Sequence, residues 1–157
     1  MTKEEFIAAA ISAARTSSAL SGLPAGITVA QAALESGWGN SQLARLAHNY
    51  FGIKAHGGCD AIEMPTCEVI GGQTLRTRAR FAKYSSMEAC FRERDAIILR
   101  LACYAEARAA AHDPEAFTRA LAKHWATDPR YAEKLLSVYQ RFALDKLDAT
   151  CKTQTEA

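Results

Sequence analysis

The sequence lacks the defining features of several protein classes. Its five cysteines include no Cys-x-x-Cys pair, which gives a zinc site little support. With only 4 prolines and 9 glycines against 32 alanines in 157 residues, the chain is neither collagen-like nor disordered, and helix is favoured. The longest uncharged stretch, 16–34, contains Pro24, two glycines and several polar side chains, so no membrane span is predicted.

No charge of one sign dominates either. The chain has 19 basic and 17 acidic residues, a net charge of +2, which is too balanced for a protein that binds nucleic acid through phosphate contacts. The small excess lies in the middle of the chain, where Arg76, Arg78 and Arg80 alternate with uncharged residues. This period of two predicts that the three side chains share one face of a strand, as a solvated surface or as a contact for an anionic polymer.

The N-terminus lacks the positive charge that a secretory signal needs, so no signal peptide is visible. Thr2 and Glu5 instead have the spacing of a capping box, which predicts a helix that ends near Ser21-Gly22. We expect further helices at about 24–36, 41–47, from Ser86 to Ala111, at 114–125 and at 129–147. The last two begin at Asp-Pro pairs, 113–114 and 128–129, in which the acid is the expected N-cap residue.

Between residues 51 and 84 the pattern changes to that of a β-hairpin. Glycine pairs, Pro65 and alternating or β-branched residues predict strands around 63–70 and 74–84, with Gly71-Gly72 at the turn. No linker divides the chain. We therefore expect one mostly helical α+β domain over 1–150, with a β-lobe at about 51–84 and a frayed polar tail at 151–157.

Glu35 is the strongest candidate for a catalytic group. Thr28, Gln31 and Glu35 are spaced three and four residues apart, so they share one face of a helix whose other residues are nearly all apolar. We expect this face to border a cleft. The negative end of the helix dipole and the neighbouring Leu34 and Trp38 disfavour the ionised form of Glu35, and a protonated carboxyl group is able to act as a general acid. A solvated helix-terminal glutamate is the alternative.

The residues around Glu35 resemble a known family. The segments AQAALESGWGNS at 30–41 and NYFGIK at 49–54, then PTCE at 65–68, RFAKYSS at 80–86 and WATDPRYA at 125–132, are similar to the glucosaminidase domains of glycoside hydrolase family 73. The resemblance implies a lysozyme-like fold, with a helical body and a small β-hairpin lobe across a cleft. It also implies hydrolysis of the β-1,4 bond between N-acetylglucosamine and N-acetylmuramic acid in peptidoglycan.

The same resemblance implies roles for individual residues. Glu35 falls on the family's catalytic acid, Glu68 on its second carboxylate and Tyr131 on a tyrosine near the cleft. The residues expected to bind substrate are Gln31, Trp38, Asn49 and Trp125. Structural alternatives remain for most of these residues: an exposed strand acid for Glu68, core packing for Tyr131 and the two tryptophans, and a turn or cap residue for Asn49.

The predicted function is therefore that of an endo-β-N-acetylglucosaminidase that needs neither a metal nor another cofactor. Glu35 protonates the leaving oxygen, and either Glu68 activates water or the 2-acetamido group of the substrate acts as an internal nucleophile. A muramidase or lytic transglycosylase acting on the same glycan is one alternative. A non-catalytic module that binds the cell wall is another, and the presence of both carboxylates argues against it.

The expected partner is the glycan strand of peptidoglycan, bound by a monomer. Because this substrate lies in the wall, we expect action in the periplasm or outside the cell, with export by a holin or an injection-type secretion machine. In such a compartment Cys59 and Cys67, which flank a short loop, are expected to form a disulfide, and five reduced thiols are the alternative.

Overall fold

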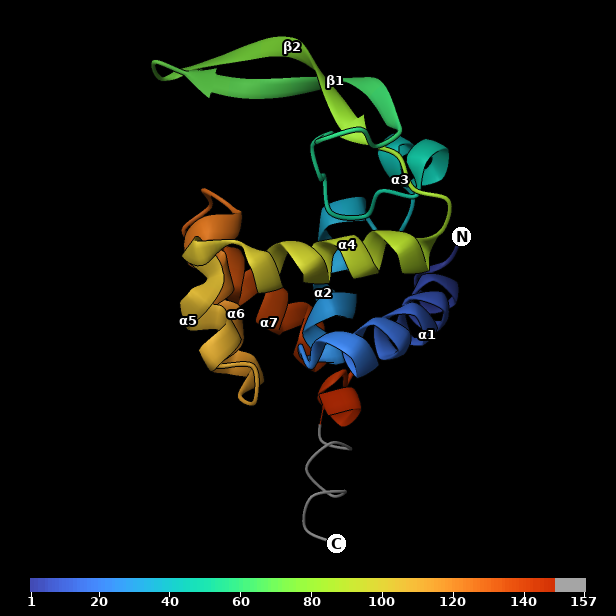
Figure 1. The fold of residues 1–157 in the computed structure, drawn as a ribbon, viewed down its shortest axis with the longest axis vertical. Helices are drawn as coiled ribbons and strands as arrows, with labels where there is room; N and C mark the ends of the chain where they lie inside the picture. The colour runs from blue at the N-terminus through green and yellow to red at the C-terminus, as the bar shows by residue number, and fades with distance from the viewer. Residues whose placement is uncertain (149–157) are drawn as a thin grey trace, which may run out of the picture.

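The computed structural model describes residues 1–148. A body of packed helices carries an antiparallel hairpin at one end, in the mostly helical α+β arrangement that the sequence predicts (Figure 1). The strands are β1 (Ala61–Ile70) and β2 (Gln73–Ala82). The helices are α1 (Lys3–Ser21), α2 (Ala25–Ser36), α3 (Gln42–Ala47), α4 (Met87–Arg100), α5 (Ala105–Ala109), α6 (Pro114–Trp125) and α7 (Tyr131–Arg141), and the 3-10 turn η1 (Ala102–Tyr104) joins α4 to α5.

Helix α2 forms the centre of the helical body. Ten of its 12 residues are buried, mostly alanines and other small residues that let neighbouring helices approach closely. It packs against α1 and α7, and α4 crosses in front of it in the view of Figure 1. Gly37, in the left-handed conformation with φ 56°, ends the helix at the predicted place. The last turn of α2 therefore emerges from the core at a defined point.

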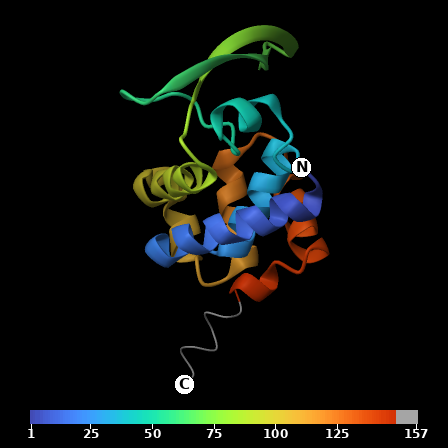
Figure 2. The same ribbon diagram turned by 90° about the vertical axis from the view of Figure 1, so that its right-hand side faces the viewer.

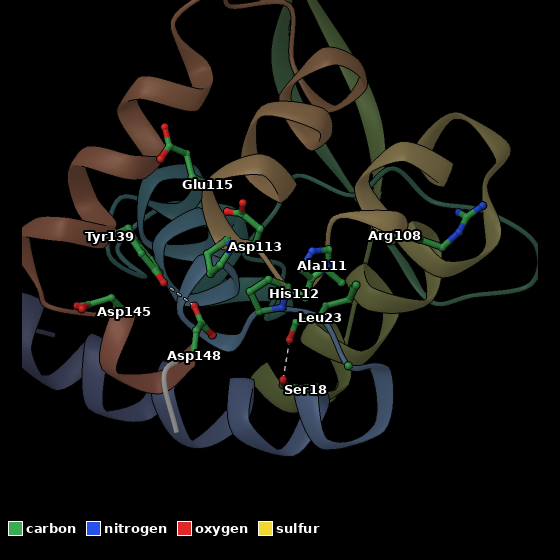
Figure 3. A pocket seen from close by; sticks show the side chains of 13 residues that line it. Ser18, Leu23, Arg108, Ala111, His112, Asp113, Glu115, Tyr139, Asp145 and Asp148 are labelled. Atoms are coloured by element: carbon green, nitrogen blue, oxygen red, sulfur yellow. Dashed lines mark hydrogen bonds between the residues drawn. The ribbon is translucent and has the colours of Figure 1, made fainter. Parts of the chain in front are cut away.

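The first turn of α2 is held by a residue distant in sequence. Pro24 occupies the N-cap position and offers no side-chain acceptor. Instead Oδ1 of Asp148 accepts a hydrogen bond of 3.0 Å from the backbone N–H of Gly26. The Tyr139 hydroxyl donates to Oδ2 of the same carboxylate at 2.8 Å, as Figure 3 shows. The segment after α7 thus supplies the helix cap that the local sequence lacks.

The backbone of the hairpin is attached to the body at its base. Strands β1 and β2 pair from Ala61↔Ala82 to Ile70↔Gln73 around the predicted Gly71-Gly72 turn. Near the base, the Ala82 N–H donates to the Ile53 carbonyl at 3.0 Å, whereas every residue of the outer third of the hairpin is exposed. Both ribbon views show the hairpin standing above the helices (Figures 1 and 2). This element has few contacts to fix its position.

The expectation of one helix from Ser86 to Ala111 is wrong. Helix α4 ends at Arg100, and Leu101 is extended at φ −75° and ψ 134°. The Arg108 Nη1 group donates to the Ile98 and Leu101 carbonyls at 2.7 Å each. A side chain from the following helix therefore satisfies the carbonyls that a continuous helix would have paired internally.

The expected helix at 129–147 is shorter than predicted at both ends. Helix α7 begins at Tyr131, and its N-cap residue is Arg130 instead of Asp128. The Asp128 carboxylate accepts from the Arg130 N–H at 2.9 Å and so stabilises the preceding turn. At the other end the helix stops at Arg141, Ala143 adopts a left-handed φ of 51°, and a further helical turn follows at 145–148.

The predicted disulfide is also wrong, because Cys59 and Cys67 are free thiols. Strand β1 is already extended at Ala61, so roughly 20 Å of strand, at about 3.3 Å per residue, separates that residue from Cys67. A disulfide requires Cα atoms within about 7 Å. The predicted tail at 151–157, with Cys151, lies outside the described residues. Within them, every helix is too short or too polar to cross a bilayer.

Gly26 is predicted to be irreplaceable at the start of α2. A Cβ atom there would lie 2.3 Å from the Leu144 carbonyl oxygen and 2.7 Å from Tyr139 Cε2. This overpacking outweighs the better helix propensity of alanine, so Gly26→Ala should lower the free energy of unfolding by about 2 kcal/mol. Urea unfolding followed by circular dichroism measures this change in the free energy of unfolding. The control is Gly58→Ala, whose Cβ meets nothing within 4 Å; equal stability of the two variants would contradict the prediction.

Candidate active site

Glu35 lies in the last turn of α2, where the helix leaves the core. On one side, the Tyr131 hydroxyl at the start of α7 donates a hydrogen bond of 2.6 Å to Glu35 Oε1. On the other side the glutamate is accessible to solvent. The carboxyl group is therefore anchored from within the protein and open toward a ligand.

The surroundings of Glu35 favour its protonated form. Desolvation by the surrounding protein raises the pKa of the Glu35 carboxyl above its usual value, while the hydrogen bond from Tyr131 lowers it and only partly offsets this shift. Because one side remains open to water, the shift reflects partial desolvation. The predicted raised pKa agrees in direction with the structure, and the result is a carboxyl group that holds its proton to higher pH than a solvated glutamate.

The other two members of the polar stripe do not border a cleft as expected. Gln31 is completely buried and Thr28 is 2% exposed. Both face Arg94 of α4, whose Nε donates to Gln31 Oε1 at 2.9 Å and whose Nη1 donates to Thr28 Oγ1 at 2.8 Å. Gln31 Nε2 in turn donates to the Tyr131 hydroxyl at 3.1 Å. Gln31, expected to bind substrate, is instead an internal link between α4 and α7 with no surface for a sugar.

Arg94 is itself completely buried. Its Nη1 also donates to Asp95 Oδ1 at 2.9 Å, and Asp95 Oδ2 accepts hydrogen bonds from the α1 residues Ser17 and Ser21. A continuous polar chain therefore runs through the core from α1 to Glu35. It joins α1, α4, α2 and α7, the four helices that fix the position of the carboxyl group.

Glu68 lies on the inward face of the hairpin. Along β1, Ile62, Met64 and Thr66 are half-buried while the residues between them are exposed, and Glu68 follows in the inward series. Its Oε1 is 3.8 Å from Lys54 Nζ in an ion pair between half-exposed side chains. Within residues 1–148, no hydrogen bond or ion pair connects Glu68 to Glu35. Arg76, Arg78 and Arg80 share the opposite, outward face, as predicted.

The remaining predicted substrate-binding residues lie in different environments. Asn49 is 1% exposed, and its amide donates to the Ile53 and Ala82 carbonyls at 2.9 Å each, so it fixes the base of the hairpin and is not available to a sugar. Trp125 is half-buried against Phe51 and Tyr104. Trp38 is half-buried, with Lys3 Nζ 4.2 Å from its ring centroid.

A cavity of about 940 Å³ lies at the other end of α2, away from Glu35. Figure 3 shows its lining, which includes His112, Asp113, Tyr139 and Asp148. None of the predicted site residues takes part in it. The cavity borders the contact between Asp148 and Gly26 that caps α2.

Comparisons with known proteins identify the family of this chain. The family model described as mannosyl-glycoprotein endo-beta-N-acetylglucosaminidase matches residues 11–144, most of the chain. The chain belongs to the glucosaminidase family. Exo-glucosaminidase LytG of Bacillus subtilis is 36% identical over 127 residues, covering 78% of this chain and 45% of LytG. The chain thus spans about half the length of the curated relatives it matches.

Solved structures of the glucosaminidase family share the fold. The catalytic domain of the autolysin Auto from Listeria monocytogenes superimposes with a TM-score of 0.84 at 28% identity, covering 92% of this chain and 86% of that one. The glycoside hydrolase domain of FlgJ from Salmonella typhimurium gives a TM-score of 0.75 at 32% identity, with coverage of 99% and 98%. The predicted lysozyme-like glucosaminidase fold is confirmed.

Sequence analysis missed Arg94 and Asp95 of this glucosaminidase domain. A signal was present, because Arg94 follows Phe91 by three residues and precedes Ile98 by four, which places it on the apolar face of α4. A charged residue at such a position needs a buried polar partner. The stripe formed by Thr28 and Gln31 on α2 is that partner.

Tyr131→Phe is predicted to raise the pKa of Glu35. The substitution removes the hydrogen bond that favours the ionised carboxylate and leaves desolvation unopposed. Carboxyl-selective ¹³C NMR titration of Glu35 measures the change. The matched control is Tyr139→Phe, which removes a hydroxyl from Asp148 at the far end of α2. A Glu35 titration that is the same in all three proteins would contradict the interpretation.

Proposed function

We propose that this domain hydrolyses the β-1,4 bond between N-acetylglucosamine and N-acetylmuramic acid in peptidoglycan, with Glu35 as the general acid. The observation that carries the proposal is a partly desolvated carboxyl group that accepts a hydrogen bond through Oε1 and belongs to a solvent-exposed side chain. Two similar proteins support the substrate, since LytG is named an exo-glucosaminidase and FlgJ a peptidoglycan hydrolase.

The chemistry requires a proton on the departing oxygen. As the bond between the anomeric carbon of N-acetylglucosamine and O4 of N-acetylmuramic acid breaks, Glu35 donates its proton to O4. Positive charge then develops on the sugar ring, and water completes the hydrolysis at the anomeric carbon. A raised pKa keeps the proton on Glu35 available for the first step near neutral pH.

Glu68 is proposed to act on the second half of the reaction. Its inward position on the hairpin and its ion pair with Lys54 keep a carboxylate facing the helical body. Closure of the hairpin over bound glycan would bring it toward the anomeric carbon, where it activates water. The 2-acetamido group of the substrate is able to share this role as an internal nucleophile, which makes Glu68 less indispensable than Glu35.

The half-buried rings of Trp125 and Trp38 are proposed to stack on sugar faces beyond the cleaved bond. Gln31 and Asn49 are excluded from direct contact by their burial. We propose that the domain acts in the cell wall. We also propose that it acts as a monomer and is exported by a holin or an injection-type secretion machine.

Reducing-end analysis of digested peptidoglycan tests the bond that is cleaved. We expect new N-acetylglucosamine reducing ends. N-acetylmuramic ends would instead indicate a muramidase, 1,6-anhydromuramic ends a lytic transglycosylase, and binding without new ends a non-catalytic module. Each of these three results would overturn the proposal.

The same assay separates the two carboxylates. Glu35→Gln should lower turnover by at least about a hundredfold, the scale of a lost general acid, and Glu68→Gln by less. Glu115→Gln, which removes an exposed carboxylate paired with Arg119 on α6, is the control and should retain full activity. A larger loss at Glu68 than at Glu35 would reverse the assigned roles.

A further inference from the structure

The buried side of Glu35 carries a series of hydrogen bonds that all point the same way. Arg94 Nε donates to Gln31 Oε1 at 2.9 Å, Gln31 Nε2 donates to the Tyr131 hydroxyl at 3.1 Å, and that hydroxyl donates to Glu35 Oε1 at 2.6 Å. Each link belongs to a different helix from the next: α4, α2, α7 and again α2. The series ends at the atom next to the one that would donate a proton to substrate.

Arg94, at the buried end of this series, sets the direction of its hydrogen bonds. A guanidinium group has donors and no acceptor, so Arg94 fixes the Gln31 amide with its oxygen toward α4. The amide nitrogen then faces the Tyr131 hydroxyl and donates to it. Having accepted this bond, the hydroxyl directs its own proton to Glu35 Oε1. Without Arg94 the amide is free to turn, and Tyr131 is then able to donate to Gln31 and accept from Glu35.

We infer that Arg94 is a positioning residue that acts through Gln31 and Tyr131 to keep the transferable proton of Glu35 on Oε2. Because Oε1 always accepts from Tyr131, a protonated Glu35 carries its hydrogen on the other oxygen. Within the described residues, Oε2 has no hydrogen-bond partner and is left for the glycosidic oxygen. This inference rests on the proposed role of Glu35 as the general acid.

The packing around Arg94 is specific for this task. Its guanidinium lies 5.7 Å from the Phe51 ring and 5.9 Å from the Phe117 ring, and Thr28 and Asp95 accept from Nη1. Replacement of buried ion pairs by apolar residues is often neutral or stabilising. Stability alone therefore gives little reason for a charged side chain at this site, whereas the direction of the hydrogen bonds requires a side chain that has donors and no acceptor.

The titratable and charged groups around Glu35 can be assigned to the neighbouring helices. Tyr131 approaches from α7, Arg94 and Asp95 lie behind Gln31 on α4, and Lys3 of α1 lies over the adjacent Trp38. Tyr131 is the one whose hydrogen bond acts on the pKa of Glu35. A substitution at Arg94 should consequently reach Glu35 through Tyr131, which a double-mutant cycle tests.

The experiment measures kcat and KM against pH on soluble peptidoglycan fragments for Arg94→Met, Tyr131→Phe and the double variant. Arg94→Met should lower kcat about tenfold with KM unchanged. Because Tyr131 would no longer donate to Glu35, the alkaline limb of the profile of kcat against pH should move up by about one pH unit, the scale of one hydrogen bond to a charged group. In the Tyr131→Phe background the same substitution should change neither quantity. Arg94→Lys retains a side chain with donors alone and should restore the wild-type limb.

If Arg94→Met does not fold, the same measurements are made on Gln31→Glu. The new carboxylate has the shape of the amide and pairs with Arg94, but it offers only acceptors to Tyr131. The Tyr131 proton should turn toward position 31, with a lower kcat and a higher alkaline limb. In the Tyr131→Phe background its effect on kcat should be smaller.

Two outcomes would overturn the inference. One is an unchanged pH profile and kcat in Arg94→Met or Gln31→Glu, with a lower unfolding midpoint as the sole effect. The other is an effect of equal size with and without the Tyr131 hydroxyl. Failure of the proposed general-acid role is distinguishable, because Glu35→Gln would then retain activity, and a different cleaved bond shows in the reducing-end analysis. Failure of the inference alone leaves Glu35→Gln inactive and the cleaved bond unchanged.

Discussion

Arg94 is a full positive charge with no exposed surface, and the helical body is arranged around the groups that accept its protons. Thr28 and Gln31 come from α2, and Asp95 is itself held by Ser17 of α1. Loss of one partner of a buried ion pair costs about 3–5 kcal/mol, so this interaction requires all these helices to stay in place. The position of Glu35 depends on the same helices, because Gln31 also donates a hydrogen bond to the Tyr131 hydroxyl, which in turn donates to Glu35.

Glu35 and Glu68 lie on elements that differ in rigidity. Helix α2 is fixed at its first turn by Asp148 and at its last by Tyr131, so Glu35 moves only if the core moves. Glu68 belongs to a two-stranded hairpin, an element with little stability of its own, whose outer third is exposed. In the proposed mechanism, Glu35, which must be placed accurately for proton transfer, is on the rigid element, and Glu68, which meets the substrate after binding, is on the adjustable one.

Local features of the sequence predicted local structure well. Gly37 and the Gly71-Gly72 pair ended helix α2 and turned the hairpin where their backbone freedom indicated. The break after Arg100 was not predictable in this way, because it depends on Arg108 reaching back to the Ile98 and Leu101 carbonyls. After α7 ends at Arg141, Asp148 accepts a hydrogen bond from the Gly26 N–H of α2, a long-range contact that no local pattern contains.

The site was predicted in part for the same reason. Spacing on α2 identified Thr28, Gln31 and Glu35 as one face, and family resemblance added Tyr131. The period of a helix gives no information on whether a polar face meets water or a buried arginine, so Thr28 and Gln31 were wrongly expected to border a cleft.

The most direct test is a crystal structure of Glu35→Gln with an uncleaved peptidoglycan oligomer. We expect the oxygen between N-acetylglucosamine and the following N-acetylmuramic acid to lie within hydrogen-bond distance of side chain 35, on the side away from Tyr131. A glycan bound elsewhere, or with the other glycosidic bond at that position, would contradict the proposed role of Glu35.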